Sequence, residues 1–255
     1  MDLIARGIRH GYEGLTVLDD VTLEVASGEI VAVIGPSGCG KSTLLRILGG
    51  LERPDGGAVL TRGAVPKGTL NPLTYVFQDF ALVPWRSVAG NVALPLEHHR
   101  LAPGERERRV ADALARVGLS DFAGALPRQL SGGMRQRTAI ARALAVDPAV
   151  LLMDEPLSAL DAQTRELLMD DLLRLSAASG FTAVYVTHNI AEAVRLGHRV
   201  VVLSRRPGRI REVVEIGVPL GERRDDHPAV AAARDRLWAL IRDEAAAADR
   251  EVVHG

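Results

Sequence analysis

The stretch at residues 35–43, Gly-Pro-Ser-Gly-Cys-Gly-Lys-Ser-Thr, constrains what this sequence can fold into more than any other feature. It matches the phosphate-loop pattern G-x-x-x-x-G-K-[ST] at every fixed position. An apolar run at residues 30–34 precedes it and is typical of a strand buried on both faces. Residues 44–48 place apolar side chains on the inward face of a helix, which Gly49-Gly50 ends. The motif therefore has the strand, turn and helix that it requires.

This loop chemistry predicts a nucleoside triphosphate site. Glycines allow backbone N–H groups to converge on an anion, and a helix N-terminus adds partial positive charge. Lys41 would neutralise the β- and γ-phosphates, and the Ser42 hydroxyl would bind Mg²⁺. A chance glycine-rich turn is the alternative, and the two correct flanks disfavour it. Cys39 lies near the same helix N-terminus, so we expect its pKa to be lowered and its thiol to be reactive.

The composition indicates an ordinary globular protein. The 255 residues allow one large α/β domain, or a core with an inserted subdomain, and 47% of them are hydrophobic. A net charge of −1 gives no general attraction to nucleic acid, which we therefore do not expect as a partner. The sequence shows no secretory signal and no apolar run of about 18 residues. The single cysteine fits a reducing compartment, and we expect a cytoplasmic protein.

Two aromatic residues in the first half of the chain, Tyr12 and Trp85, each allow two interpretations. Residues 3–9 and 17–25 predict two strands around a turn that contains Tyr12. This tyrosine could stack on a base, worth about 1–3 kcal/mol, but local sequence favours an ordinary half-buried turn residue. Residues 59–71 are poorly patterned and predict irregular edge strands and a loop. Residues 73–77 predict a strand, and the loop that follows carries apolar side chains up to Trp85, which are core or, if exposed, a contact site.

Polar side chains follow several predicted strands and begin one helix. Gln78 follows the strand at 73–77 and could orient a water or a metal ligand, or be solvated. The apolar strand at 150–154 ends in Asp154 and Glu155, which is rare unless a cation faces the acids, although two solvated carboxylates remain possible. In a phosphate-loop protein Asp154 would bear on Mg²⁺ and Glu155 would polarise a water. His188 ends the strand at 181–187, where open α/β sheets bind ligands, although a lone histidine is more often structural.

Helices occupy the middle and the end of the chain. The apolar spacing in residues 110–117 predicts a helix capped by Gly118. The sequence Ser131-Gly132-Gly133 begins another helix and is either a second anion cradle or a plain cap. Asp161 is the expected N-cap of a helix that runs to about residue 176. Residues 228–250 predict an amphipathic C-terminal helix.

Taken in order, these motifs resemble those of ATP-binding-cassette ATPases. The resemblance rests on the phosphate loop, Gln78, Leu-Ser-Gly-Gly at 130–133, Leu-Met-Asp-Glu-Pro at 152–156, Ser-Ala-Leu-Asp at 158–161 and His188. It covers residues 3 to about 220. It implies a P-loop NTPase, RecA-like α/β core (3–86 and 148–220), an inserted helical subdomain (about 87–147) and an antiparallel β edge. The whole ATP-binding domain would span 3–235.

The resemblance also implies roles for individual residues. Tyr12 would stack on adenine, which reverses the local interpretation, and Glu155 would be the general base. His188 would contact the γ-phosphate, and Gln78 would act in catalysis and, with Ser42 and Asp154, hold Mg²⁺. The remaining residues would bind ATP: Gly35, Pro36, Ser37, Gly38, Cys39, Gly40, Lys41, Ser42 and Thr43 in one copy, and Ser131, Gly132 and Gly133 towards the nucleotide of a second, head-to-tail copy.

A narrower resemblance points to the nitrate, sulfonate and taurine importer ATPases. It rests on Val-Phe-Gln-Asp at 76–79, Leu-Val-Pro-Trp-Arg-Ser-Val at 82–88, Met134 and Arg-Pro-Gly-Arg at 206–209. It implies a subunit peripheral on the inner face of the cell membrane, with permease subunits as partners and a solute-binding protein as an indirect one. Asn189 departs from the aspartate usual in the family.

Three other functions remain as alternatives. A soluble cassette ATPase of translation or repair usually has two cassettes or a long coiled-coil insertion, and this sequence has neither. An exporter ATPase would carry the same catalytic motifs, and only the region of Trp85 argues against it. A non-hydrolysing scaffold is disfavoured by the presence of Glu155 and His188.

Overall fold

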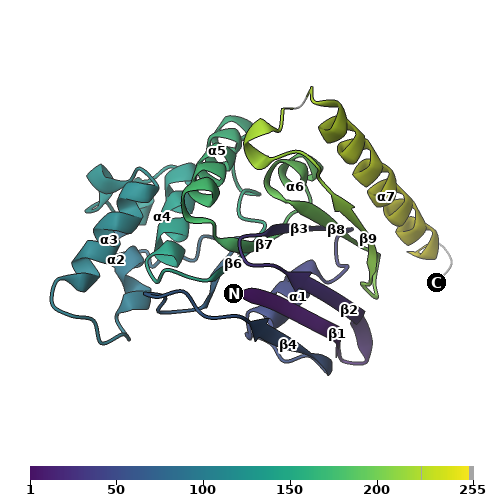
Figure 1. The fold of residues 1–255 in the computed structure, drawn as a ribbon, viewed down its shortest axis with the longest axis horizontal. Helices are drawn as coiled ribbons and strands as arrows, with labels where there is room; N and C mark the ends of the chain where they lie inside the picture. Colours follow the sequence, from purple (N-terminus) through teal and green to yellow (C-terminus); the bar gives the residue numbers. More distant parts are fainter. Residues whose placement is uncertain (225, 253–255) are drawn as a thin grey trace. The chain divides into compact units, whose positions relative to one another are not determined.

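The structure is a computed structural model that describes residues 1–224 and 226–252 (Figure 1). The chain forms two units, one of Met1–Ala64 with Phe181–Gly255 and the other of Val65–Gly180. We call them unit 1 and unit 2. In the part of the chain that the structure describes, no helix has the length and apolar character needed to cross a membrane.

Unit 1 contains an antiparallel sheet in the order β2-β1-β4. Its strands are β1 (Asp2–Tyr12), β2 (Leu15–Val25) and β4 (Gly56–Arg62). Glu13 and Gly14 both have positive φ and make the tight turn between β1 and β2. Because the turn takes only these two residues, both strands are longer than the predicted ranges 3–9 and 17–25. β4 begins before the poorly patterned segment 59–71, and most of its residues are exposed. The predicted antiparallel edge is confirmed.

Unit 1 also contains a mainly parallel set of strands in the order β7-β3-β8-β9. These are β3 (Ile30–Ile34), β7 (Thr182–Val186), β8 (Arg199–Leu203) and the antiparallel β9 (Ile210–Glu215). Every residue of β3 and β7 is buried, as expected for parallel strands covered on both faces. The continuous apolar runs in the sequence reflect this burial.

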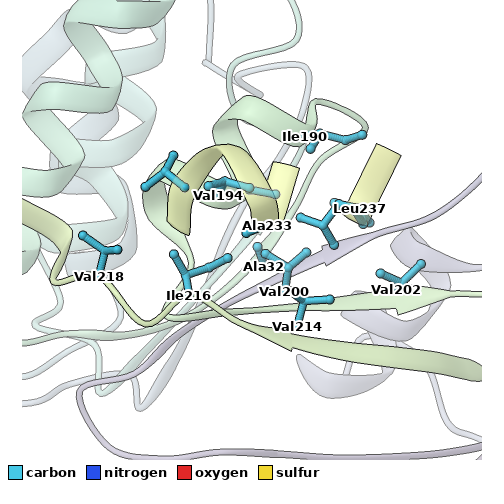
Figure 2. Close-up of a cluster of buried hydrophobic side chains, with 13 residues drawn as sticks. Ala32, Ile190, Val194, Val200, Val202, Val214, Ile216, Val218, Ala233 and Leu237 are labelled. Atoms are coloured by element: carbon cyan, nitrogen blue, oxygen red, sulfur yellow. The ribbon is translucent and has the colours of Figure 1, made fainter. Parts of the chain in front are cut away.

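The described part of unit 1 also contains the helices α1 (Lys41–Leu48), α6 (Ile190–Leu196) and α7 (Pro228–Val252) and the 3-10 turn η4 (Leu220–Glu222). Figure 2 shows the apolar core that α6 and α7 form with the strands. Val194 of α6, Val214 of β9 and Leu237 of α7 are buried together in it. The amphipathic C-terminal helix that the sequence predicts is thus packed on its apolar face.

Unit 2 combines a short parallel strand pair with a group of helices. β5 (Leu73–Val76) pairs with β6 (Val150–Asp154). The helices are α2 (Val88–Ala93), α3 (Glu105–Arg116), α4 (Gly132–Leu144) and α5 (Ala162–Ser179), with 3-10 turns η1 (Leu94–Leu96), η2 (Ser120–Phe122) and η3 (Pro127–Gln129). α2, α3 and α4 pack on one another. The α/β fold and the helical insertion agree with the predicted fold class.

Local sequence explains where the longest helix of unit 2 begins and ends. Asp161 is the N-cap of α5, and its carboxylate accepts a hydrogen bond from the N–H of Thr164 at 3.0 Å, as predicted. The helix runs past residue 176 to Gly180, which has a φ of 59°. Glycine adopts this left-handed conformation without strain, so it fixes the C-terminal end.

Candidate nucleotide site

The predicted site residues fall into two groups. Unit 1 contains the phosphate loop, Tyr12 and His188. Unit 2 contains Gln78, Asp154, Glu155 and the Ser131-Gly132-Gly133 sequence.

The phosphate loop connects β3 to α1, and Lys41 is folded back onto it. The Lys41 ammonium donates hydrogen bonds to the carbonyl oxygens of Gly35 and Pro36, both at 2.9 Å. Gly40 is the N-cap of α1 with a φ of 101°, and a Cβ there would lie 2.7 Å from Leu18 Cδ2. Only glycine fits this position. The loop therefore presents a fixed positive charge at the N-terminus of a helix, the arrangement that binds phosphate.

Cys39 corrects one sequence-based expectation. We expected the helix N-terminus to lower its pKa, and this prediction is wrong. The side chain is 0% exposed, and burial raises the pKa of the thiol despite the nearby charge of Lys41. Burial disfavours the thiolate because the charged form loses its hydration. Cys39 is therefore a packed residue of the loop, and its thiol lacks the exposure that a reactive cysteine needs.

Tyr12 is the last residue of β1 and is 40% exposed. Its ring makes an edge contact with His10, with ring centroids 4.8 Å apart and planes at 88°. Partial burial and a hydrogen bond with Glu52 raise the pKa of the Tyr12 hydroxyl, so the ring stays neutral. A half-exposed neutral ring held by a neighbour is suited to stacking on a base.

His188 is an exposed residue two positions after the end of β7, and a buried polar network holds the turn that carries it. The carboxylate of Glu192, 3% exposed, accepts hydrogen bonds from the hydroxyls of Tyr185 at 2.9 Å and Thr187 at 2.8 Å. The Thr187 hydroxyl in turn accepts the N–H of Asn189 at 3.0 Å. Asn189 caps α6 by accepting from the N–H groups of Ala191 and Glu192. Asn189, which stands where the resembled family usually has aspartate, therefore still provides an N-capping side chain next to the histidine.

In unit 2, Asp154 ends β6 and is 7% exposed. The Tyr75 hydroxyl donates a hydrogen bond to Asp154 Oδ2 at 2.9 Å. The described residues contain no cluster of three or more His, Cys, Asp or Glu side chains that could hold a metal ion. Asp154 is a candidate ligand of unit 2, as one buried carboxylate at the end of β6. Mg²⁺ in nucleotide sites is held by few protein oxygens together with phosphates and waters, so one such carboxylate fits this role.

Glu155 follows Asp154 in an unusual backbone conformation. Its φ is 43°, in the left-handed region that non-glycine residues rarely adopt. Its carbonyl oxygen accepts two hydrogen bonds from Ser158, from the N–H at 3.1 Å and from the hydroxyl at 2.9 Å. The backbone that carries this carboxylate is thus held by the Ser-Ala-Leu-Asp sequence.

The Ser131-Gly132-Gly133 sequence begins α4. Ser131 is the N-cap, and its hydroxyl accepts the N–H of Met134 at 3.2 Å. A Cβ at Gly133 would lie 2.4 Å from Thr164 Cγ2, so close packing within unit 2 requires glycine there. Both interpretations from the sequence fit this geometry: the serine caps the helix, and the helix N-terminus remains suited to an anion.

The loop after Gln78 is held by hydrogen bonds to its backbone, while some of its side chains are exposed to solvent. Gln78 itself is exposed, and Trp85 is 79% exposed. The guanidinium of Arg142 in α4 donates to the carbonyl oxygens of Phe80 and Ala81. The fully buried Asn91 donates to the carbonyl oxygens of Val83, Arg86 and Ser87, and its Oδ1 accepts the N–H of Val83 at 2.7 Å. The exposed indole thus projects from a firmly bonded turn.

A model of the ABC transporter family matches residues 18–158 of this sequence. The chain belongs to the ABC transporter family. The family resemblance found in the sequence is confirmed, and with it the assignment as an ATPase.

This ABC transporter ATPase is similar to two curated relatives and to one solved structure. It is 49% identical over 227 residues to the aliphatic sulfonates import ATP-binding protein SsuB 1 of Xanthomonas axonopodis pv. citri, covering 88% of this chain and 90% of that protein. It is 45% identical over 211 residues to the spermidine/putrescine import ATP-binding protein PotA of Pseudomonas aeruginosa, covering 82% of this chain and 58% of that protein. The dimeric post-hydrolysis structure of the ATP-binding cassette MJ0796 bound to ADP and Pi aligns with a TM-score of 0.72 and 34% identity, covering 85% of this chain and 100% of that one.

Sequence reasoning missed three features of this ABC transporter ATPase. These are the hydrogen bond of Tyr75 to Asp154, the bonds of Ser158 to Glu155, and the buried Glu192 network. The hydrogen bond of Tyr75 had a usable signal in the sequence, namely a tyrosine in the predicted strand at 73–77, while Asp154 ends another predicted strand. The bonds of Ser158 to Glu155 depend on a local backbone conformation. The Glu192 network depends on a buried carboxyl group at a helix position that the sequence does not mark as unusual.

Proposed function

We propose that this ABC transporter ATPase energises the import of a small oxyanion of the nitrate, sulfonate or taurine type. The observation that carries this proposal is the 49% identity to a sulfonate import ATP-binding protein across 90% of that protein. A relative named for spermidine and putrescine import is 45% identical, so the overall identity supports import more strongly than it supports a particular solute.

The chemistry that we propose follows from the two groups of residues. Lys41 and the loop N–H groups bind the phosphates of ATP, and Tyr12 stacks on adenine. Bound Mg²⁺, held by Ser42, Gln78 and Asp154, would neutralise the phosphate charge. Glu155 accepts a proton from the attacking water, and His188 contacts the γ-phosphate.

We propose three kinds of partner. A second copy binds head-to-tail, so that Ser131, Gly132 and Gly133 reach its nucleotide; the dimeric MJ0796 cassette supports this arrangement. Permease subunits bind at the exposed Trp85 and place the protein on the inner face of the membrane, and a solute-binding protein acts through them. The ATP-binding domain then spans 3–235, with its helical subdomain at about 87–147.

An exporter subunit and a soluble ABC ATPase are the competing functions. Both would use the same catalytic residues, so partners distinguish them. Recovery from membranes with a multi-span permease would support transport, whereas recovery with ribosomes or DNA would contradict it. Accumulation of the solute in inverted vesicles would instead indicate export.

The direct test is ATPase activity in proteoliposomes that contain the permease and the solute-binding protein. We expect sulfonate, taurine or nitrate to stimulate ATP hydrolysis, and Glu155→Gln to bind ATP while hydrolysing it about 10²–10⁴-fold more slowly, since a general base is lost. Lys41→Ala serves as the matched variant, because it should fail earlier, at ATP binding. Near-normal turnover in Glu155→Gln would contradict the role of Glu155, and stimulation by polyamines alone would contradict the solute class.

A further inference from the structure

We propose that Tyr75 is a positioning residue that orients the carboxylate of Asp154 for divalent metal. The inference rests on the proposed role of Asp154 in holding Mg²⁺. It concerns a residue that neither the motifs nor the family resemblance selects.

The register of β5 and β6 brings the two side chains together. The strands are parallel neighbours, with Tyr75 beside Leu152 and Val76 beside Met153. Asp154 therefore lies beyond the partner of Tyr75 along β6, and the long phenol side chain spans that offset. Its hydroxyl donates to Asp154 Oδ2 at 2.9 Å. Because Asp154 is buried, this bond acts where little water competes for the carboxylate.

The bond restricts the carboxylate in a way that matters for a metal ligand. The terminal torsion of aspartate is broad, so an unrestrained carboxylate samples many orientations about its Cβ–Cγ bond. A donor bound at Oδ2 fixes that rotation and makes the two oxygens inequivalent. Hydrogen bonds of this kind to metal-binding carboxylates are worth about 10–100-fold in metal affinity.

Tyr75 is itself held in place independently of its hydroxyl. Its ring packs against Phe77 with centroids 4.5 Å apart and planes at 36°. Tyr75→Phe therefore removes the hydrogen bond while keeping the ring and its packing. Tyr185→Phe is a matched control in unit 1, because the Tyr185 hydroxyl donates to another buried carboxylate, Glu192, also at 2.9 Å.

The test measures Mn²⁺ affinity of the full-length protein in complex with ADP, by electron paramagnetic resonance. We expect Tyr75→Phe to weaken Mn²⁺ binding about 10–100-fold, with ADP affinity in EDTA unchanged. Tyr185→Phe should leave Mn²⁺ affinity unchanged. Raising the Mg²⁺ concentration should restore the ATPase rate of Tyr75→Phe, which a loss of packing would not allow.

Asp154→Asn separates the two hypotheses. If it keeps full Mn²⁺ affinity, the proposed role of Asp154 is wrong and the inference falls with it. If Asp154→Asn loses Mn²⁺ affinity while Tyr75→Phe keeps it and binds ADP normally, only the role of Tyr75 is overturned. In a protein that carries both substitutions, we expect Tyr75→Phe to add no further loss of Mn²⁺ affinity to that of Asp154→Asn. The reason is that the Tyr75 hydroxyl acts through the Asp154 carboxylate. Additive losses would overturn the inference.

Discussion

Ser158 donates two hydrogen bonds to a single acceptor, the carbonyl oxygen of Glu155. Glu155 needs this support because its backbone is left-handed, with a φ of 43°. Such conformations cost of order 1–3 kcal/mol and persist only where the surroundings hold them. Ser158 thus helps to hold the left-handed backbone of the proposed general base.

Ser158→Ala should slow catalysis while leaving ATP binding unchanged. The variant keeps the N–H bond to Glu155 but loses the hydroxyl bond. We expect kcat to fall roughly tenfold, less than the roughly 10²-fold loss from a 1 Å misplacement, with KM for ATP unchanged. Ser158→Thr keeps a hydroxyl and should retain most of the rate. Steady-state kinetics check both, and a rise in KM at constant kcat would contradict the positioning role.

The Cys39 thiol should resist maleimide in the folded protein, with or without Mg-ATP. Burial raises its pKa and removes access, so neither the thiolate nor a path to it is present. Mass spectrometry after labelling should show no adduct in buffer and one adduct in about 6 M guanidinium, which unfolds the protein and exposes the thiol. Rapid labelling of the native protein that ATP suppresses would restore the original expectation of a reactive loop cysteine.

Trp85→Ala should weaken binding to the permease without unfolding the subunit. An indole that is 79% exposed contributes little to the core, so the free energy of unfolding should change by within about 0.5 kcal/mol. Co-purification with the permease should fall, because buried aromatic anchors dominate interfaces. Leu167→Ala, at another exposed apolar residue, is the control and should co-purify normally. A large loss of thermal stability in Trp85→Ala would place the indole in a core instead.

His198 should make stability depend on pH in the acidic range. Burial and the charge of Arg223 lower the pKa of His198, and its Nδ1 accepts the N–H of Ile30 at 2.9 Å, which requires an unprotonated nitrogen. Below the ordinary value of 6.5 the unfolded chain binds a proton that the folded chain does not. The free energy of unfolding should therefore fall as the pH drops from about 6.5 towards the lowered pKa.

Urea unfolding of His198→Asn checks this dependence. Asparagine can still accept the N–H of Ile30 but does not titrate, so its stability should fall less over the same pH range. Identical pH profiles in the two proteins would show that His198 is not responsible.

Mixed dimers of two inactive variants should recover ATPase activity. Lys41→Ala disables the phosphate loop and Ser131→Arg disables the start of α4. If each ATP uses Lys41 of one copy and Ser131 of the other, one interface combines both defects and the other has neither. Mixing the purified variants should therefore restore phosphate release. Absence of rescue, with subunit exchange confirmed, would mean that each chain completes its own site.

Sequence and structure agree where a pattern is local. The phosphate loop, its buried strand and its helix follow from a contiguous motif and from parallel strands covered on both faces. Cys39 shows the limit, because a helix N-terminus is visible in sequence while the burial of its thiol comes from the fold. Tyr75 and Asp154 are distant in sequence and meet only through strand register. β4 was hard to predict because its mostly exposed residues show no alternation.

The buried Cys39 makes this protein a convenient scaffold for spectroscopic reporters. Cysteines introduced at exposed positions would be its accessible thiols, so spin labels would attach to them and not to Cys39. Cys39 can stay in place, which spares a residue whose carbonyl oxygen lies against Gly208. Cysteines at Leu167 and Trp238, exposed residues of unit 2 and unit 1, would let pulsed resonance follow the distance between the units through a cycle of ATP hydrolysis.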